Sequence, residues 1–493
     1  MPAPGRTTEE TSPRWPTVEQ LRTRVAPKHA VAVIYVLSMF ATIMDGTIVN
    51  VALPTFGHDF HAPVSSVQWV VLGYLLSLAL FIPASGWIGD RLGTKRTYLS
   101  AVVVFTGASA LCASAHALGE LVTFRVVQGA GGGLMLPVGT AMLFRAFAPA
   151  ERANASRILI IPTVLAPAVG PVLGGLLIDQ LSWRWIFTVN IPIGAVALLF
   201  GTIFLREHRQ SPQGRFDGAG FVLSGLGLAL VLYGVSEGPL VGWGAPRVPA
   251  TMVVGAVMLV VFVRHVTRRT DPMLRLRLLS DRIFRASNLV SVFGFGAFMG
   301  VLFVTPLYLQ EARGFSPLVS GLTTFPEAIG VISGSQIAAR LYPGIGPRRL
   351  MFGGLVSVTA LPASFALLGG STDLWFVRVL MFAVGVGMAF VIMPLQAAAF
   401  ATISPANTGH ASAIFNTQRQ VAAAVVVAVL STVLDTTGSG HIAPSAGAFH
   451  PVFLVDAALC AIGIAMTFTV HDADAAGTMR PGARMTTPAD EAA

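Results

Sequence analysis

The chain is long, strongly apolar and poor in charge. Of its 493 residues, 54% are hydrophobic and only 11% are charged, and the mean hydropathy is +0.72. The formal net charge of +9 comes from basic residues scattered over short segments, which argues against a nucleic-acid-binding domain and favours a membrane topology set by charge. The composition therefore predicts an all-α polytopic membrane protein.

Apolar blocks of helix length recur along the whole chain. A helix crosses the hydrocarbon core with about 20 apolar residues, because in lipid its backbone groups must be satisfied within the segment. The blocks predict fourteen transmembrane helices, at residues 31–54, 67–89, 98–116, 120–147, 155–179, 184–205, 217–236, 250–266, 285–310, 318–340, 350–369, 374–400, 409–434 and 450–470.

Basic residues are concentrated in the amino-terminal tail and in alternate connections between blocks. The positive-inside rule retains such segments in the cytoplasm, and an even number of spans then leaves both termini on that side. We expect a multi-pass protein of the cytoplasmic (inner) membrane. Its polar tails, residues 1–28 and 472–493, are expected to be disordered.

Two parts of the chain resemble each other. Pro149-Ala150 followed by Ala155-Ser156 recurs, with the same internal spacing, as Pro405-Ala406 followed by Ala411-Ser412. Repeated halves that move around a site near the midplane are typical of secondary transporters. We therefore predict two six-helix bundles related by pseudo-twofold symmetry, residues 29–205 and 285–471, with two inserted helices and a cytoplasmic linker at 206–284.

Asp45 lies in the middle of the first apolar block. An ionised carboxylate is costly there, so its proton should be exchangeable with a substrate or a partner at a central opening. Alternatively, Asp45 bonds Thr47 or Asn50 and only holds helices together.

The connection after the second block has a G-x-x-x-D-R-x-G pattern. Its glycines permit a close helix approach and a turn, and its carboxylate can meet a helix N-terminus or a basic partner. This predicts a latch that breaks when the conformation changes, although a solvated basic loop is the alternative. The candidate latch residues are Gly86, Asp90, Arg91, Gly93, Lys95 and Arg96.

Arg125 lies inside the fourth block. A guanidinium in lipid costs at least about 2.5 kcal/mol, so Arg125 should face a cavity or an acidic partner. The alternative is a structural arginine that extends its side chain toward the outer interface.

The fifth block contains a proline among small residues. Proline kinks a helix and small residues permit tight packing, which suits a pivot between the halves, or merely a packing motif. The residues of this candidate pivot are Gly170, Pro171, Gly174 and Gly175.

The carboxyl-terminal half offers two further candidates. Glu327 follows Pro326 near the centre of the tenth block, where protonation, pairing or a wet cavity must accommodate it. Arg419, in the thirteenth block, could face a cavity. Glu237 and Asp456 lie near outer ends of blocks and are expected to contact solvent.

These segments together resemble the major facilitator superfamily in its fourteen-span, drug:proton antiporter (EmrB/QacA-like) branch. The stretch Met44–Pro54 resembles the span 1 motif of drug:proton antiporters, and Trp183–Gly194 resembles a stretch typical of the fourteen-span branch. Phe124–Gly131 resembles the span 4 signature of proton-coupled members.

Two of the resemblances are incomplete. The pattern at 86–96 resembles the superfamily's loop signature, except that Thr94 stands where a basic residue is usual. The segment at 170–175 resembles the antiporter signature, except that Ala166 replaces the expected upstream glycine.

The resemblance implies proton-coupled efflux (antiport) of amphipathic or cationic organic compounds by alternating access. It assigns proton coupling or substrate binding to Asp45, Arg125, Glu327 and Arg419. We expect no cofactor and no metal, with the proton gradient as energy source, because the sequence has no phosphate-binding loop. The expected partners are a small-molecule substrate, protons and the lipid bilayer, and no nucleic acid.

The protein is expected to be a monomer and not an enzyme. Two alternatives of function stay open. One is a proton-coupled exporter of a single metabolite or self-made antibiotic, and the other is an uptake symporter.

Overall fold

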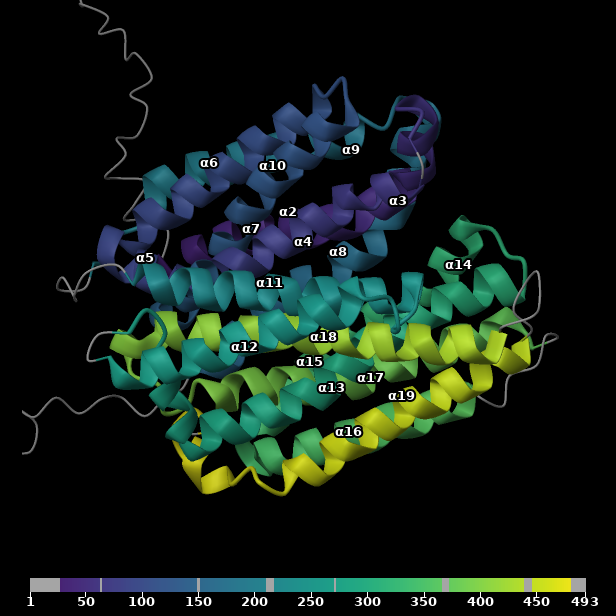
Figure 1. The fold of residues 1–493 in the computed structure, drawn as a ribbon. Helices are drawn as coiled ribbons and strands as arrows, with labels where there is room; N and C mark the ends of the chain where they lie inside the picture. Colours follow the sequence, from purple (N-terminus) through teal and green to yellow (C-terminus); the bar gives the residue numbers. More distant parts are fainter. Residues whose placement is uncertain are drawn as a thin grey trace, which may run out of the picture.

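The computed structural model describes residues 27–62, 64–148, 151–209, 217–269, 272–365, 372–438 and 446–479. Within these ranges the chain forms helices joined by short turns, and no β strand occurs. The long helices run side by side (Figure 1). The predicted all-α class is confirmed.

The helices follow one another with few residues between them. The first part of the chain contains α2 (Pro27–Asp59), α3 (Val64–Val67), α4 (Trp69–Phe81), α5 (Ser85–Leu92), α6 (Thr94–Ala113), α7 (Leu118–Ala146), α8 (Arg152–Gln180), α9 (Trp185–Thr188) and α10 (Asn190–Phe204). Next come α11 (Gly218–Val241), α12 (Arg247–Arg268) and η2 (Leu276–Ser280). The last part contains α13 (Arg282–Leu307), η3 (Tyr308–Ala312), α14 (Pro317–Thr324), α15 (Pro326–Ile345), α16 (Pro347–Phe365), α17 (Leu374–Ala399), η4 (Pro405–Asn407), α18 (Thr408–Gly438), α19 (Ala446–Thr467), η5 (Asp472–Ala475) and α20 (Ala476–Met479).

A helix lies at each of the fourteen predicted spans. In the part of the chain that the structure describes, 10 helices are long and apolar enough to cross a membrane, and α4 with α5, bent by 57°, would make 11. The helices at the other three predicted spans, α8, α15 and α16, do not meet that criterion. The multi-pass membrane character is therefore clear, and the number fourteen stays a prediction.

The residues of both predicted tails that adjoin the helices are themselves helical in the structure. Helix α2 already begins at Pro27, and residues 472–479 form η5 and α20. This terminal segment is held by Asp472, whose carboxylate accepts a hydrogen bond from the Arg348 backbone N–H at 2.8 Å, and by a 2.7 Å hydrogen bond between the Tyr342 and Thr478 hydroxyls. Residues 1–26 and 480–493, which contain the rest of both tails, lie outside the described ranges.

The first and last parts of the chain pair their helices in the same order. Helix α2 packs on α8 and α10, and α7 packs on α4 and α6. In the last part α13 packs on α18 and α19, and α17 packs on α15 and α16. In Figure 1 the first part lies above the last part. This order agrees with the repeat seen in the sequence.

The inserted helices lie against both parts. Helix α12 packs on α11, and α11 contacts α4 of the first part and α18 of the last part. Tyr233 of α11 stacks on Trp69 with 5.7 Å between ring centroids, and the Trp243 indole N–H donates to the Thr432 hydroxyl at 2.9 Å. The insertion therefore covers a seam between the two parts.

Glycines allow α15 and α17 to approach backbone to backbone. A Cβ atom at Gly385 of α17 would collide with the backbone carbonyl of Glu327 on α15. Gly353 on α16 is exposed, and a Cβ atom added there would have no neighbour within 4 Å.

We predict opposite effects from alanine at these two glycines. Gly385→Ala should destabilise the protein by about 1 to 3 kcal/mol because α15 and α17 must separate. Gly353→Ala should be neutral or slightly stabilising, because alanine is the better helix former. Thermal unfolding of the two purified variants in one detergent checks this, and equal melting temperatures would contradict the packing.

Candidate functional site

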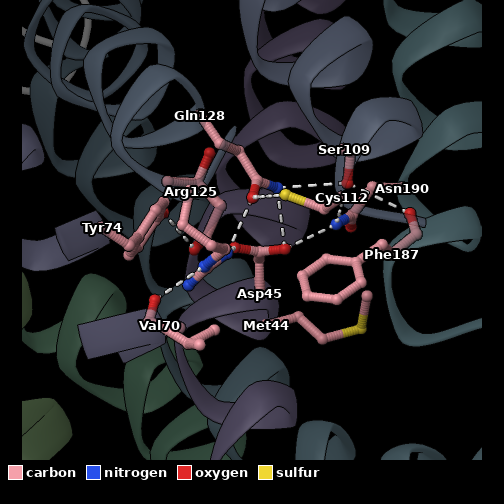
Figure 2. Close-up of polar contacts among 12 residues, drawn as sticks. Met44, Asp45, Val70, Tyr74, Ser109, Cys112, Arg125, Gln128, Phe187 and Asn190 are labelled. Atoms are coloured by element: carbon pink, nitrogen blue, oxygen red, sulfur yellow. Dashed lines mark hydrogen bonds and ion pairs between the residues drawn. The ribbon is translucent and has the colours of Figure 1, made fainter. Parts of the chain in front are cut away.

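Asp45 lies at the centre of a polar network inside the first part of the chain. Its side chain is fully buried on α2. Oδ1 accepts hydrogen bonds from the Asn190 amide at 2.8 Å and the Gln128 amide at 2.9 Å, and Oδ2 pairs with Nη1 of Arg125 (Figure 2). Helices α2, α7 and α10 therefore meet at one carboxylate.

Arg125 of α7 is also fully buried. Besides Asp45, its guanidinium donates to the Val70 carbonyl at 3.1 Å and to the Gln128 side-chain oxygen at 2.8 Å. Its Cζ lies 4.1 Å from the centroid of the Tyr74 ring (Figure 2), where a cation is favoured. The predicted acidic partner is confirmed, and the alternative that Arg125 extends toward the outer interface is wrong.

The sequence reasoning missed three members of this network as functional residues. Gln128 lies three residues after Arg125, on the same face of α7. The Ser109 hydroxyl of α6 accepts from both the Gln128 and the Asn190 amides at 3.1 Å. Amide and hydroxyl side chains inside apolar blocks were the available signal, since a buried polar group needs a partner.

The alternative in which Asp45 only holds helices together stays open, but the partners it names, Thr47 and Asn50, are wrong. Thr47 donates to the Met44 carbonyl and Asn50 approaches the Gly46 carbonyl, so neither contacts the carboxylate. Asp45 instead holds α7 and α10 against α2. Buried opposite charges compensate each other only while both are present.

A small cavity, with about 10 Å³ of space for the centre of a water-sized sphere, lies between the two parts of the chain. Helices α2 and α7 supply one wall, and α17 and α18 with the residue after α17 supply the other. This space holds about one water molecule and is far smaller than typical small-molecule sites, so the cavity is nearly closed in this conformation. The lining residues are Tyr35, Thr140, Phe144, Gln396, Phe400, Phe415, Asn416 and Arg419.

The cavity contains only one of the four residues predicted for coupling or substrate binding. Arg419 lines it, as expected, whereas Asp45, Arg125 and Glu327 are not among its lining residues. The expectation of Asp45 at a central opening does not hold in this conformation, because Gln128, Arg125 and Asn190 enclose the carboxylate.

Glu327 is buried near the start of α15, with 3% of its surface exposed. Its Oε1 has no hydrogen-bond partner among the residues described, and within the same ranges Glu327 joins no ion pair. The structure therefore separates Glu327 from the Asp45 network and from the cavity.

Two acidic residues expected to contact solvent are buried instead. Glu237 is paired with Arg247 at 3.0 Å. Asp456 of α19 is 1% exposed, and neither carboxylate oxygen finds a hydrogen-bond partner in the described ranges. The solvent expectation was wrong because depth along an apolar helix does not reveal which of its faces meets a neighbouring helix.

The candidate latch joins the first and last parts of the chain through two of its residues. Asp90 accepts a hydrogen bond from Arg145 at 2.9 Å, and Arg145 donates to the Pro405 carbonyl at 3.1 Å. A Cβ on Gly86 would lie 2.8 Å from the Gly409 carbonyl, so α5 touches α18 backbone to backbone. We use the name α5–α18 contact for this whole group, which joins α5 and the end of α7 to η4 and the start of α18.

Beside the α5–α18 contact, the two parts also meet through aromatic rings. Phe144 of α7 and Phe400, which follows α17, stack with 4.3 Å between centroids. Both residues line the cavity. This end of the cavity, where the predicted cytoplasmic loops lie, is therefore closed by packed rings and by the Asp90–Arg145 pair.

The described contacts of the other candidate latch residues lie within the first part of the chain. Gly93 has a positive φ of 98° that favours glycine. The Lys95 and Arg96 backbone N–H groups donate to Glu207 at 3.0 and 3.3 Å, and the Arg91 guanidinium lies over the Trp87 ring. The motif thus divides into a half that reaches α18 and a half that fastens the α5–α6 turn.

The candidate pivot glycines are packing positions on α8. A Cβ on Gly170 would collide with Thr47 of α2, and one on Gly174 would lie 2.8 Å from Ile48. Gly175 has no neighbour within 4 Å, and the Pro171 side chain lies outside the described part. Helix α8 thus packs closely on the turn of α2 that follows Asp45, and its role as a pivot stays a prediction.

Comparison with known proteins adds the family. The model of the Major Facilitator Superfamily matches residues 35–427. The chain belongs to the major facilitator superfamily. It is a membrane transporter. Among its described residues, no group of three His, Cys, Asp or Glu side chains could hold a metal ion.

Curated relatives carry names that refer to drug resistance. A multidrug resistance protein B homolog of Mycobacterium tuberculosis is 35% identical over 407 residues, 81% of this chain and 75% of that protein. The putative multidrug resistance protein MdtD of Pectobacterium atrosepticum is 29% identical over 424 residues, 85% of this chain and 90% of that protein.

A solved structure shares the fold. The human organic anion transporter MFSD10 superposes with a TM-score of 0.64 over 90% of this chain and 99% of that one, at 17% sequence identity. At this identity the likeness shows the fold alone.

We predict strong coupling between Asp45 and Arg125 in stability. Asp45→Asn or Arg125→Gln alone should each cost about 3 to 5 kcal/mol, because the remaining charge is buried without compensation. The double variant should lose less than the sum of the two. A double-mutant cycle on the unfolding free energy of the purified protein measures this, and additive losses would refute the pairing.

We also predict that Asp90 keeps the cavity closed at the end of the predicted cytoplasmic loops. In a Thr140→Cys background, Asp90→Asn should speed modification by an impermeant thiol reagent from that side about tenfold. Asp90 holds Arg145, whose hydrogen bond to the Pro405 carbonyl joins the two parts, and such a charge-assisted bond contributes roughly 1.5 kcal/mol. Cys112 and Cys460 are both buried and should react slowly.

Arg91→Gln is the matched control for this test, because the described contact of its side chain is with Trp87 of the same part. Equal labelling rates for Asp90→Asn and Arg91→Gln would show that the Asp90–Arg145 pair does not hold this end shut.

Proposed function

We propose that the protein is a proton-coupled exporter of amphipathic organic compounds, drugs among them, in the cytoplasmic membrane. In this proposal fourteen spans form two six-helix bundles and an inserted pair, with both termini in the cytoplasm. Transport is an exchange of compound for proton by alternating access. The names of the relatives support drug efflux, and the observation that carries the coupling is the enclosed Asp45–Arg125 pair.

Protonation of Asp45 would change the packing of several helices at once. The carboxylate accepts from Asn190 and Gln128 and compensates Arg125. A proton on Asp45 removes that compensation, so the buried guanidinium must find another partner or reach water. Helices α7 and α10 would then lose their common partner on α2.

The close packing of α8 would transmit this change toward the other half. Gly170 and Gly174 place α8 directly on the turn of α2 that follows Asp45, and α8 also packs on α15 and α17. A shift of α2 therefore has a short mechanical route to the last part of the chain. Opening of the α5–α18 contact would then expose the cavity to the cytoplasm.

Glu327 is a second proton-binding candidate in this proposal. With no ion pair in the described ranges and 3% exposure, an ionised carboxylate would be poorly accommodated there. Protonation is therefore the best remaining way to hold Glu327 in this conformation.

A proton gradient supplies enough energy. One proton that enters down about 100 mV contributes roughly 2.3 kcal/mol, and one pH unit adds about 1.4 kcal/mol. Together these support roughly a 500-fold solute gradient for a one-to-one exchange.

We predict that Asp45→Asn abolishes transport driven by a pH gradient. In proteoliposomes with one imposed pH gradient, the wild type should move a drug against its concentration gradient and opposite to proton flow. Asp45→Asn should fall to the level of empty liposomes, and Asp45→Glu should retain transport because it keeps a carboxylate. The assay compares equal amounts of folded protein.

The control is Asp435→Asn, a carboxylate of α18 outside the Asp45 network and the cavity, which should leave transport unchanged. Proton-driven extrusion that persists in Asp45→Asn would overturn the role of Asp45. Movement of compound and proton in the same direction would instead identify an uptake symporter.

A further inference from the structure

The cavity between the two parts has a positive charge and no negative one. Arg419 is the charged residue among its lining residues, and the polar groups beside it are neutral: the hydroxyls of Tyr35 and Thr140 and the amides of Gln396 and Asn416. Asp45 and Glu327, the carboxylates expected to bind substrate or protons, do not line the cavity. Arg419 would repel a cation that entered this cavity, and no carboxylate lines it to compensate.

Arg419 differs from Arg125 and Arg145 in its partners. Arg125 and Arg145 are each paired with a carboxylate, Asp45 and Asp90. Arg419 makes no hydrogen bond or ion pair in the described part of the chain, and its contacts are aromatic. Its Cζ lies 3.8 Å from the centroid of Phe295 and 5.8 Å from that of Phe415.

The stacking on Phe295 fixes the position of the guanidinium and leaves its donors unused. A guanidinium carries five N–H donors and binds a carboxylate with two parallel hydrogen bonds. Nearby, the side-chain oxygen of Gln396 is buried without a hydrogen-bond partner among the residues described. The site therefore offers a fixed cation for an anionic group and, in the Gln396 side-chain oxygen, an acceptor for an N–H or O–H donor of a zwitterionic ligand.

The remaining wall of the cavity is aromatic. Phe144, Phe400 and Phe415 line it, with 4.3 Å between the first two ring centroids and 5.8 Å between the last two. Such a wall suits a flat apolar body next to a charged group. In this conformation the cavity has room for about one water molecule, so a drug-sized compound would enter only when the two parts separate.

We propose that Arg419 binds an anionic group of the exported compound, so that the preferred substrates are amphipathic aromatic acids or zwitterions and not simple cations. This inference rests on the proposed function, because its ligand is the transported compound. The carboxylate would pair with Arg419 while the aromatic body lies against the phenylalanine rings.

Matched acids and esters test the proposal. Rhodamine 110 carries a free carboxylate, and rhodamine 123 is its methyl ester and a cation. The same comparison is made with 1-naphthoic acid and its methyl ester, at neutral pH and equal concentration. Binding of each compound to the purified full chain in detergent is measured by equilibrium dialysis and by the shift in melting temperature.

We expect each acid to bind the wild type at least about tenfold more tightly than its ester, as a charge-assisted pair implies. Arg419→Gln should remove this preference. Arg419→Lys should keep part of it, because lysine retains the charge and loses the fork. Should Arg419→Gln fail to fold, the comparison of Arg419→Lys with the wild type still measures the loss of preference.

Arg378→Gln is the matched control. Arg378 also lies over an aromatic ring, with its Cζ 4.8 Å from the centroid of Trp375, but it does not line the cavity. This variant should keep the full preference for acids.

Equal binding of acid and ester by the wild type, including no binding of either, overturns the proposal, and so does an acid preference that survives in Arg419→Gln. The result is independent of proton coupling, because binding requires no gradient. Acid-selective binding without gradient-driven flux would sink the proposed function alone, whereas gradient-driven flux without acid preference would sink only this inference.

Discussion

A pair of opposite charges that cannot reach water organises the first part of this protein. Asp45 and Arg125 compensate each other inside the bundle, and the amides of Gln128 and Asn190 complete the coordination of the carboxylate. Neither charge is tolerable alone in such surroundings. The relative placement of α2, α7 and α10 therefore depends on one contact, which makes that contact sensitive to a single proton.

The positions of the helices could be predicted from the sequence, because the length of an apolar segment can be read directly from consecutive residues. The cost of a charge in lipid likewise singled out Asp45 and Arg125 separately. Their pairing could not be predicted, since it depends on how α2 and α7 are rotated about their axes. Almost uniformly apolar helices give little information on rotation, and the same limitation produced the wrong expectation for Asp456.

The residues of the latch motif have two separate structural roles, contact with the last part of the chain and stabilisation of a turn. Gly86 and Asp90 reach α18 and Arg145, whereas Gly93 and the backbone of Lys95 fasten the turn to Glu207. The pattern predicts that a tight turn and a charged contact occur together. It does not indicate which residues cross between the two parts, because that is decided by segments about 300 residues further along the chain.

The inserted pair of helices limits how the two parts can move. The inserted pair is attached to one part by the stacking of Tyr233 of α11 on Trp69, and to the other by the hydrogen bond from Trp243, in the turn after α11, to Thr432. If the parts rotate against each other, α11 can travel as a rigid body with only one of them. The packing of α11 on the opposite part must then slide or break, so the insertion resists rotation of the two parts against each other.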